Sequence, residues 1–266
     1  MTPSDVFCEA VAGWLGERTP LVVGVCAAQG AGKSTLCRTV KARLERFPKA
    51  QGWRVAVLSL DDLYLSHAAR AELAARVHPL FATRGVPGTH DVALGARVLD
   101  ALRAGGTARL PRFDKASDDP LPQSDWPEAA APDLILFEGW CVGVPAQAAS
   151  ALAAPVNALE RDEDTDGVWR RAVNDALAGP YAELWARIDR LVFLAAPDFD
   201  TVLRWRAEAE HDLRRKGGAR LMDDAQVVRF VRHYERLTRH ALAVMPERAD
   251  LTLRLDAARR ISATTS

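Results

Sequence analysis

The stretch Gly24-Val-Cys-Ala-Ala-Gln-Gly-Ala-Gly-Lys-Ser-Thr35 decides the fold of this chain. It follows the apolar run Leu21-Val22-Val23 and precedes a segment with helical spacing of apolar residues. A strand, a glycine-rich loop and a helix in this order hold a nucleoside triphosphate, because backbone N–H groups and the helix N-terminus point at the phosphates. Ala27 stands where the usual motif has a glycine, but the rest of the motif is intact. We therefore expect the triphosphate to be bound by Gln29, Gly30, Ala31, Gly32, Lys33, Ser34 and Thr35.

Composition limits the possible classes of protein. The chain has 266 residues, 48% of them hydrophobic, and a formal net charge of zero, which argues against a generally basic nucleic-acid surface. The four cysteines form no C-x-x-C pair, so we expect free thiols in a reducing compartment. No signal peptide and no apolar run of about 18 residues stands out. We expect a soluble, cytoplasmic protein with no nucleic-acid or membrane partner.

Apolar runs and helical patterns alternate along the chain, which predicts an α/β fold with a parallel sheet covered on both faces. We expect a single domain over residues 1–266, with connections near 128–132 and 145–155 and a frayed stretch over the last ten residues or so. The predicted strands are 21–25, 54–60, 134–137, 190–195 and 251–255. The predicted helices include one that begins at Thr2 and those over 33–46, 92–103, 200–216 and 223–244.

Three predicted strands end in groups that suit phosphoryl transfer: the glycine-rich loop, Asp61-Asp62 and Glu138. Ligands of an open α/β sheet bind beyond the carboxyl ends of the strands, so these groups should converge. We expect Asp61 to act as the general base and Lys33 to hold the β- and γ-phosphates. Ser34 and Glu138 would then bind Mg²⁺. The alternatives are that Asp61 or Asp62 caps the next turn and that Glu138 is an ordinary surface residue.

Arginines crowd the predicted helix near residues 200–222. A solvated basic face is one interpretation. The other is a lid whose arginines, among them Arg204 and Arg214, neutralise the transferred phosphoryl group, with Gly217-Gly218 as a hinge or cap. Two loops, 84–91 and 112–115, carry arginine, histidine and lysine and suggest anion or hydroxyl recognition.

With these residues assembled, the chain resembles the P-loop kinases related to uridine kinase, pantothenate kinase and phosphoribulokinase, and among them the plant and fungal type of D-glycerate 3-kinase. The resemblance runs from about residue 20 to about 256. Its most specific segments are Arg84-Gly-Val-Pro-Gly-Thr-His-Asp91 and Leu110-Pro-Arg-Phe-Asp-Lys115. It implies a three-layer α/β/α P-loop fold and transfer of the γ-phosphoryl group of ATP, with Mg²⁺, to a hydroxyl of D-glycerate. The implied acceptor contacts are Asp61, Tyr64, Arg84, His90, Asp91, Arg112, Asp114, Lys115 and Trp140.

Two other functions stay open at this point. One is a related kinase for a nucleoside, pantothenate or a sugar phosphate. The other is a non-catalytic, nucleotide-dependent assembly factor, although Asp61 and the acceptor-like loops would have no purpose there. Leu63, where relatives often carry phenylalanine, and the alanine-rich stretch 144–173 depart from the family pattern. The oligomeric state is expected to be a monomer or a homodimer.

Overall fold

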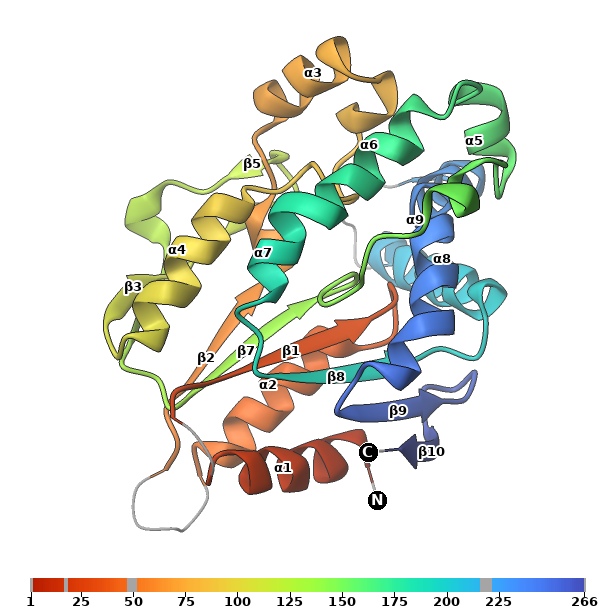
Figure 1. Ribbon diagram of the computed structural model, residues 1–266. Helices are drawn as coiled ribbons and strands as arrows, with labels where there is room; N and C mark the ends of the chain where they lie inside the picture. The colour runs from red at the N-terminus through yellow and green to blue at the C-terminus, as the bar shows by residue number, and fades with distance from the viewer. Residues whose placement is uncertain (1, 17–18, 47–51, 216–221, 266) are drawn as a thin grey trace.

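A twisted sheet forms the centre of the computed structural model, which describes residues 2–16, 19–46, 52–215 and 222–265 (Figure 1). Its strand order is β10-β9-β8-β1-β7-β2, and all neighbours are parallel except β10 and β9. The five predicted strands are therefore confirmed. The strands of this sheet are β1 (Leu21–Ala27), β2 (Val55–Ser59), β7 (Leu134–Gly139), β8 (Arg190–Ala195), β9 (Leu251–Leu255) and β10 (Ile261–Thr265).

Two layers of helices cover the sheet, so the predicted three-layer arrangement is confirmed. Alternate residues of β1 face opposite cores: Val23 packs with α1, α2 and α8, whereas Val22 packs with α4 and α7. Long α9 contributes to both cores. The helices are α1 (Pro3–Trp14), α2 (Lys33–Leu44), α3 (His67–Arg76), α4 (Val92–Arg103), α5 (Ala158–Glu163), α6 (Val168–Ala176), α7 (Ala182–Trp185), α8 (Phe199–Arg215) and α9 (Asp224–Val244).

Helix starts follow ordinary capping chemistry. Thr2 closes a capping box with Asp5 at the start of α1, as predicted, and Asp223 does the same with Gln226 at α9. Short helical turns complete the chain: the 3₁₀ turns η1 (Leu60–Leu63), η2 (Pro79–Ala82), η3 (Gln123–Asp125), η4 (Ala149–Leu152) and η6 (Met245–Glu247), and the π turn η5 (Leu177–Tyr181).

Three segments that were expected to lack regular structure contain strands or a helical turn. The end of the chain was expected to fray, but β10 pairs with β9 across a tight turn, so that prediction was wrong. The connection near 128–132 contains strand β6, and the one near 145–155 contains η4. The remaining short strands pair in two antiparallel sheets, β3 (Thr107–Arg109) with β6 (Glu128–Ala130) and β4 (Phe113–Asp114) with β5 (Asp119–Pro120).

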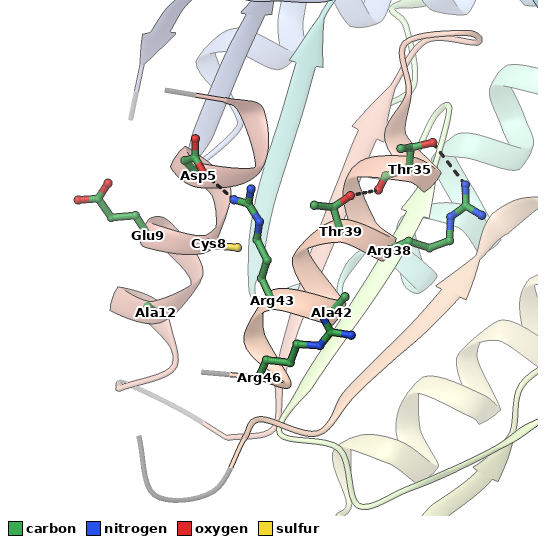
Figure 2. A pocket seen from close by; sticks show the side chains of 10 residues that line it. All are labelled: Asp5, Cys8, Glu9, Ala12, Thr35, Arg38, Thr39, Ala42, Arg43 and Arg46. Carbon is green, nitrogen blue, oxygen red and sulfur yellow. Dashed lines mark hydrogen bonds and ion pairs between the residues drawn. The ribbon is translucent and has the colours of Figure 1, made fainter. Parts of the chain in front are cut away.

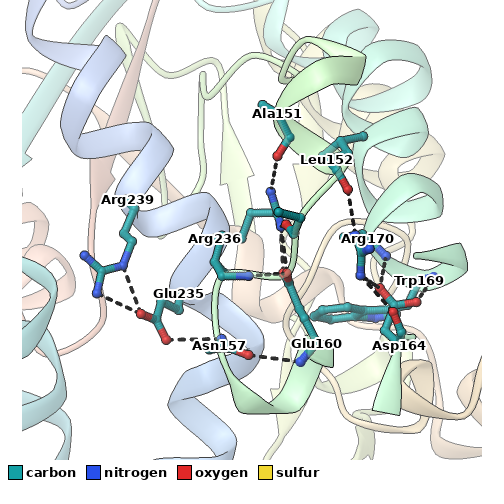
Figure 3. Close-up of polar contacts among 12 residues, drawn as sticks. Ala151, Leu152, Asn157, Glu160, Asp164, Trp169, Arg170, Glu235, Arg236 and Arg239 are labelled. Atoms are coloured by element: carbon teal, nitrogen blue, oxygen red, sulfur yellow. Dashed lines mark hydrogen bonds and ion pairs between the residues drawn. The ribbon is translucent and has the colours of Figure 1, made fainter. Parts of the chain in front are cut away.

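A buried polar network joins the segment between β7 and α6 to helix α9 (Figure 3). The Arg236 guanidinium donates to both carboxylate oxygens of Glu160, at 2.8 and 2.7 Å, and also to two backbone carbonyls. Arg170 and Asp164 form a second buried pair at 3.0 Å. Both pairs are satisfied by several hydrogen bonds. The Arg236–Glu160 pair therefore fixes this segment against α9, and the Arg170–Asp164 pair fixes it against α6.

Candidate active site

The glycine-rich loop connects β1 to α2 in a conformation that needs glycine at two positions. Gly30 and Gly32 have φ angles of +77° and +89°, which residues with a Cβ atom rarely adopt. Gly32 is the N-cap of α2, so the loop ends at a helix N-terminus, where backbone N–H groups favour an anion. Within the loop, the Gln29 Oε1 atom is buried, and Ala31 N–H donates to Ala28 O at 3.2 Å. Thr35, in the first turn of α2, lines a hollow between α1 and α2 (Figure 2).

Lys33 and Ser34 face the carboxylate of Glu138 on β7. The Ser34 hydroxyl donates to Glu138 Oε1 at 2.8 Å, and Lys33 Nζ lies 3.9 Å from Oε2. Burial alone would lower the pKa of Lys33, but the carboxylates of Glu138 and Asp61 outweigh it and raise that pKa. Lys33 is therefore a fixed cation between two carboxylates at the mouth of the loop.

The two acidic strand ends lie side by side. In the parallel register of β2 and β7, Ser59 is opposite Glu138, and η1 then places Asp61 two residues further on. A cleft of about 990 Å³ is lined by Ser34, Asp61 and Glu138 together with Asp62, Arg112 and Lys115. The structure thus brings the loop and both predicted carboxylates to one cleft.

Asp61 is held by hydrogen bonds to both of its oxygens. Tyr64 donates its hydroxyl to Oδ1 at 2.7 Å, and Lys115 donates to Oδ2 at 2.8 Å. Burial would raise the pKa of Asp61, but the charges of Lys115 and Lys33 and these two hydrogen bonds hold it well below its usual range. Asp61 is therefore an ionised acceptor whose Oδ2 partner, Lys115, is more than half exposed.

The loop 112–115 brings two cations to the cleft and turns its carboxylate away. Asp62 accepts from Arg112 at 3.2 Å and from Phe113 N–H at 3.1 Å, so it anchors this loop beside Asp61. Burial raises the pKa of Asp62. The Asp114 carboxylate instead accepts from the N–H groups of Ala116 and Ser117 within its own turn. Arg112 and Lys115 thus line the cleft, whereas Asp114 shapes the β4–β5 hairpin.

The loop 84–91 packs against Tyr64 rather than lying open, and none of its residues lines the cleft. The His90 ring stacks on Tyr64 at a centroid distance of 4.7 Å, and its Nδ1 shares a hydrogen bond with the Tyr181 hydroxyl at 2.5 Å. Burial lowers the pKa of His90 to about 3, so the ring is neutral. Asp91 caps α4 by accepting from Leu94 N–H at 2.8 Å. His90 therefore supports Tyr64, and Asp91 has a structural task.

Arg84 belongs to this loop and Trp140 contacts it, but neither of these two predicted acceptor contacts lines the cleft. Arg84 pairs with Asp118, which also accepts from the buried Arg70 at 2.5 Å. Trp140 is buried and donates its Nε1–H to Gly85 O at 2.8 Å. Arg84 keeps a partly exposed guanidinium, since about a quarter of its side chain is accessible.

The donor set fits a magnesium ion. The Glu138 Oε2 atom is buried and accepts no hydrogen bond from any residue that the structure describes. A buried carboxylate oxygen without a hydrogen bond, beside a serine hydroxyl, suits a hard cation with oxygen ligands. No cluster of three or more histidine, cysteine or acidic residues suited to a metal occurs within the described ranges.

Comparisons with known proteins find kinases. The chain is 35% identical over 233 residues to the uncharacterized kinase mug58 of Schizosaccharomyces pombe, covering 82% of this chain and 79% of that protein. The chain belongs to this family of P-loop kinases. It is also 34% identical to the chloroplastic D-glycerate 3-kinase of Arabidopsis thaliana, over 81% of this chain but only 46% of the plant protein. No protein-family model matches.

A solved structure gives the same relationship in three dimensions. The D-glycerate 3-kinase of Cryptococcus neoformans superposes with a TM-score of 0.82 and 28% identity, covering 99% of this chain and 98% of the other. The protein is therefore a phosphotransferase with an alcohol acceptor and a P-loop nucleotide site. Within the described ranges, none of the kinase's helices has the length and apolar character that crossing a bilayer requires.

The arginines predicted for the lid are occupied by local partners in this kinase. Arg204 donates to Thr201 Oγ1 at 2.8 Å, and Arg214 pairs with Asp224 at 3.0 Å and bonds to Met222 O. Gly217 and Gly218 lie outside the described residues. The lid over 200–222 and the ATP contacts of these two arginines stay predictions.

Several residues that sequence reasoning missed hold the loop 84–91 of the kinase in place. Tyr234 of α9 is buried and donates to Arg84 O at 2.9 Å. A Cβ at Gly85, where φ is +131°, would lie 1.8 Å from the Tyr234 hydroxyl, so this glycine permits the approach. Asp118 joins Arg70 to Arg84. These contacts connect segments that are 34 to 150 residues apart, and periodicity and motif spacing carry no signal for them.

A second hollow, also of about 990 Å³, lies between α1 and α2 (Figure 2). Arg43 and Asp5 form an ion pair at its edge, and Thr39 bonds to Thr35 O within α2. Its lining includes Thr35 but neither of the two strand-end carboxylates, whereas the cleft at the strand ends has both.

Proposed function

We propose that this kinase transfers the γ-phosphoryl group of ATP to a hydroxyl of D-glycerate, giving phosphoglycerate and ADP. The observation that carries the acceptor is the charge around Asp61. Lys115 contacts the Asp61 carboxylate, and Arg112 lines the same cleft. A small acceptor that carries its own carboxylate fits this cationic surface, and arginine suits bidentate carboxylate binding.

Each residue has a task in the proposed reaction. Lys33 neutralises the β- and γ-phosphates, and Ser34 and Glu138 would hold Mg²⁺, which would supply further charge neutralisation. The acceptor hydroxyl takes the place of Lys115 at Asp61 Oδ2, and the freed ammonium turns to the acceptor carboxylate. Tyr64 stays on Oδ1 and keeps the carboxylate aimed. Asp61 then accepts the hydroxyl proton as the phosphoryl group moves.

The low pKa of Asp61 is compatible with this task. Phosphoryl transfer passes through a loose transition state, so positioning the hydroxyl and stabilising charge matter more than proton affinity. When the acceptor displaces Lys115 from the Asp61 carboxylate, the positive charge that lowers the pKa of Asp61 most is removed. Binding of glycerate would therefore strengthen the base that it needs.

An ADP-release assay over an acceptor panel tests the proposal. We expect turnover with D-glycerate and little with uridine, pantothenate or glycerol. Glycerol is the matched control, because it has the hydroxyls of glycerate without the carboxylate. Turnover with a nucleoside or pantothenate would assign the protein to the related kinases. Nucleotide binding without turnover of any acceptor would favour an assembly factor. We expect the enzyme to work in the cytoplasm as a monomer or homodimer.

A further inference from the structure

The turn between β9 and β10 reaches across the sheet edge to the phosphate loop. Asp256 closes this turn by accepting from the N–H groups of Ala258 and Arg260, both at 2.9 Å. Arg259, at the end of the turn, has a φ of +62°. This left-handed conformation is uncommon for a residue with a Cβ atom and usual for glycine. The left-handed backbone of an arginine at this position must therefore be stabilised by the contacts of its side chain.

Those contacts join three distant segments. Arg259 Nε–H donates to the carbonyl oxygen of Gly30 at 2.8 Å, and its Nη2 donates to Glu208 of α8 at 2.8 Å. The guanidinium also lies over the Trp205 indole, 5.0 Å from the ring centroid. Trp205 in turn donates its Nε1–H to Ala257 O at 2.8 Å, so α8 and the turn hold each other.

The loop itself is packed tightly at this point. A Cβ at Gly30 would lie 2.7 Å from the Cβ of Trp205, so the loop backbone touches α8 directly. Because a peptide unit is planar, fixing the Gly30 carbonyl also fixes the orientation of the Ala31 N–H. The conformation of the loop at Gly30 and Ala31 is thus connected to Arg259 by one charge-assisted hydrogen bond, and to α8 by one packing contact.

We propose that Arg259 is a positioning residue for nucleotide binding: it holds the phosphate loop in its triphosphate-binding conformation and couples it to α8. The inference rests on the nucleotide half of the proposed function and is independent of the acceptor. Loss of a hydrogen bond from a charged donor corresponds to roughly a 10- to 100-fold change in an equilibrium constant. We expect a weakening of this size in nucleotide affinity, with the Michaelis constant for the acceptor unchanged.

The test is calorimetric titration of the full chain with Mg²⁺ and the non-hydrolysable analogue AMP-PNP, using Arg259→Ala and Arg259→Gly. Both variants lose the side-chain contacts, but glycine accepts the left-handed backbone and alanine does not. We expect the Gly variant to unfold at a higher temperature than the Ala variant, while both bind AMP-PNP equally weakly. The matched control is Arg260→Ala, which removes a neighbouring, exposed arginine of the same turn and should leave affinity unchanged.

The outcomes separate the two proposals. If the wild-type chain binds no AMP-PNP, the proposed function fails. If the wild type binds and both Arg259 variants bind equally well, the positioning role is refuted. Affinity that recovers in the Gly variant together with its stability would also refute it, because Arg259 would then act only on folding.

Discussion

Asp61 shows how charge is set by neighbours rather than by burial. A buried carboxylate would ordinarily have a raised pKa, and Asp62 next to it does. Asp61 differs because Lys115 and Lys33 both act on it and Tyr64 donates to it. The same two-residue sequence therefore yields an ionised carboxylate for chemistry and a second carboxylate that anchors the loop 112–115.

The first prediction concerns the base. Replacing Asp61 by Asn keeps the shape but removes the proton acceptor, so turnover should fall by ~10²–10⁴-fold while AMP-PNP affinity stays nearly intact. Steady-state kinetics and calorimetric titration measure the two quantities. The control Asp62→Asn should act mainly on the Michaelis constant for the acceptor, because Asp62 bonds to Arg112 and Phe113 N–H. Full activity of Asp61→Asn would rule out the base.

The second prediction concerns His90 and the pH dependence of stability. The folded-state pKa of His90 is about 3, below the value of about 6.5 in an unfolded chain. The unfolded chain therefore binds a proton first as pH falls, so stability present above about pH 6.5 is lost toward pH 3. Each such histidine contributes a slope of up to about 1.4 kcal/mol per pH unit.

Urea unfolding between pH 6.5 and 5 measures this slope. We expect His90→Gln to reduce the dependence of the unfolding free energy on pH by the contribution of one histidine. His233, whose pKa burial lowers to about 4, should contribute a second share, so the double variant should be flatter still. An unchanged slope in His90→Gln would mean that the ring is solvated in the folded state.

At the residue scale, the sequence predicts those groups whose position follows from strand ends. Asp61 and Glu138 converge because parallel strands end at one edge of a sheet. Arg259 and Tyr234 could not be predicted, since their partners lie 229 and 150 residues away in the chain and only tertiary packing brings them together. Asp91 and Asp114 have local structural contacts, which a motif cannot distinguish from a ligand contact.

At the element scale, the β4–β5 hairpin connects α3 to the loop 84–91 through a single carboxylate. Asp118, with a φ of +65°, accepts from Arg70 of α3 and pairs with Arg84. Arg70 is almost fully buried, and both guanidinium groups lie over the Phe113 ring. The hairpin, α3 and the loop 84–91 therefore form one unit.

The third prediction follows from this unit. Asp118→Asn leaves the buried Arg70 charge without its carboxylate, so unfolding free energy should fall by about 3 kcal/mol. The Michaelis constant for glycerate should rise, since Arg84 loses its anchor. Thermal unfolding and kinetics measure both effects. Asp119→Asn, which weakens only a bond to His67 N–H, is the neighbouring control and should change stability by about 1 kcal/mol or less.

Long periodic elements were predictable and short ones were not. The five predicted strands and the helices α2, α4, α8 and α9 follow from runs and stripes of apolar residues. Strands β6 and β10 have few buried residues, because each is an exposed edge paired on one side. Without a buried face they lack the alternation that identifies a strand.

At the scale of the whole molecule, the alanine-rich stretch after β7 behaves as part of the core scaffold. It is attached to α9 by polar contacts rather than by apolar packing alone (Figure 3). Tyr234 of α9 also donates to Arg84 O. Sequence patterns gave little guidance for this stretch, since its attachment depends on a buried ion pair whose arginine lies on α9. Glu160 and Arg236, for example, are separated by 76 residues.

The fourth prediction tests this attachment. Glu160→Gln leaves the Arg236 guanidinium buried without a carboxylate, and breaking such a pair costs about 3–5 kcal/mol. In a chain of this size the melting temperature should fall by roughly 10 °C. Glu163→Gln, on the same helix, removes an exposed pair with Arg229 and should cost less than about 1 kcal/mol. Equal shifts in the two variants would show that burial of the Glu160 pair adds nothing. A loss of turnover in folded Glu160→Gln would show instead that the network also acts on the cleft, because the variant leaves every group that lines the cleft unchanged.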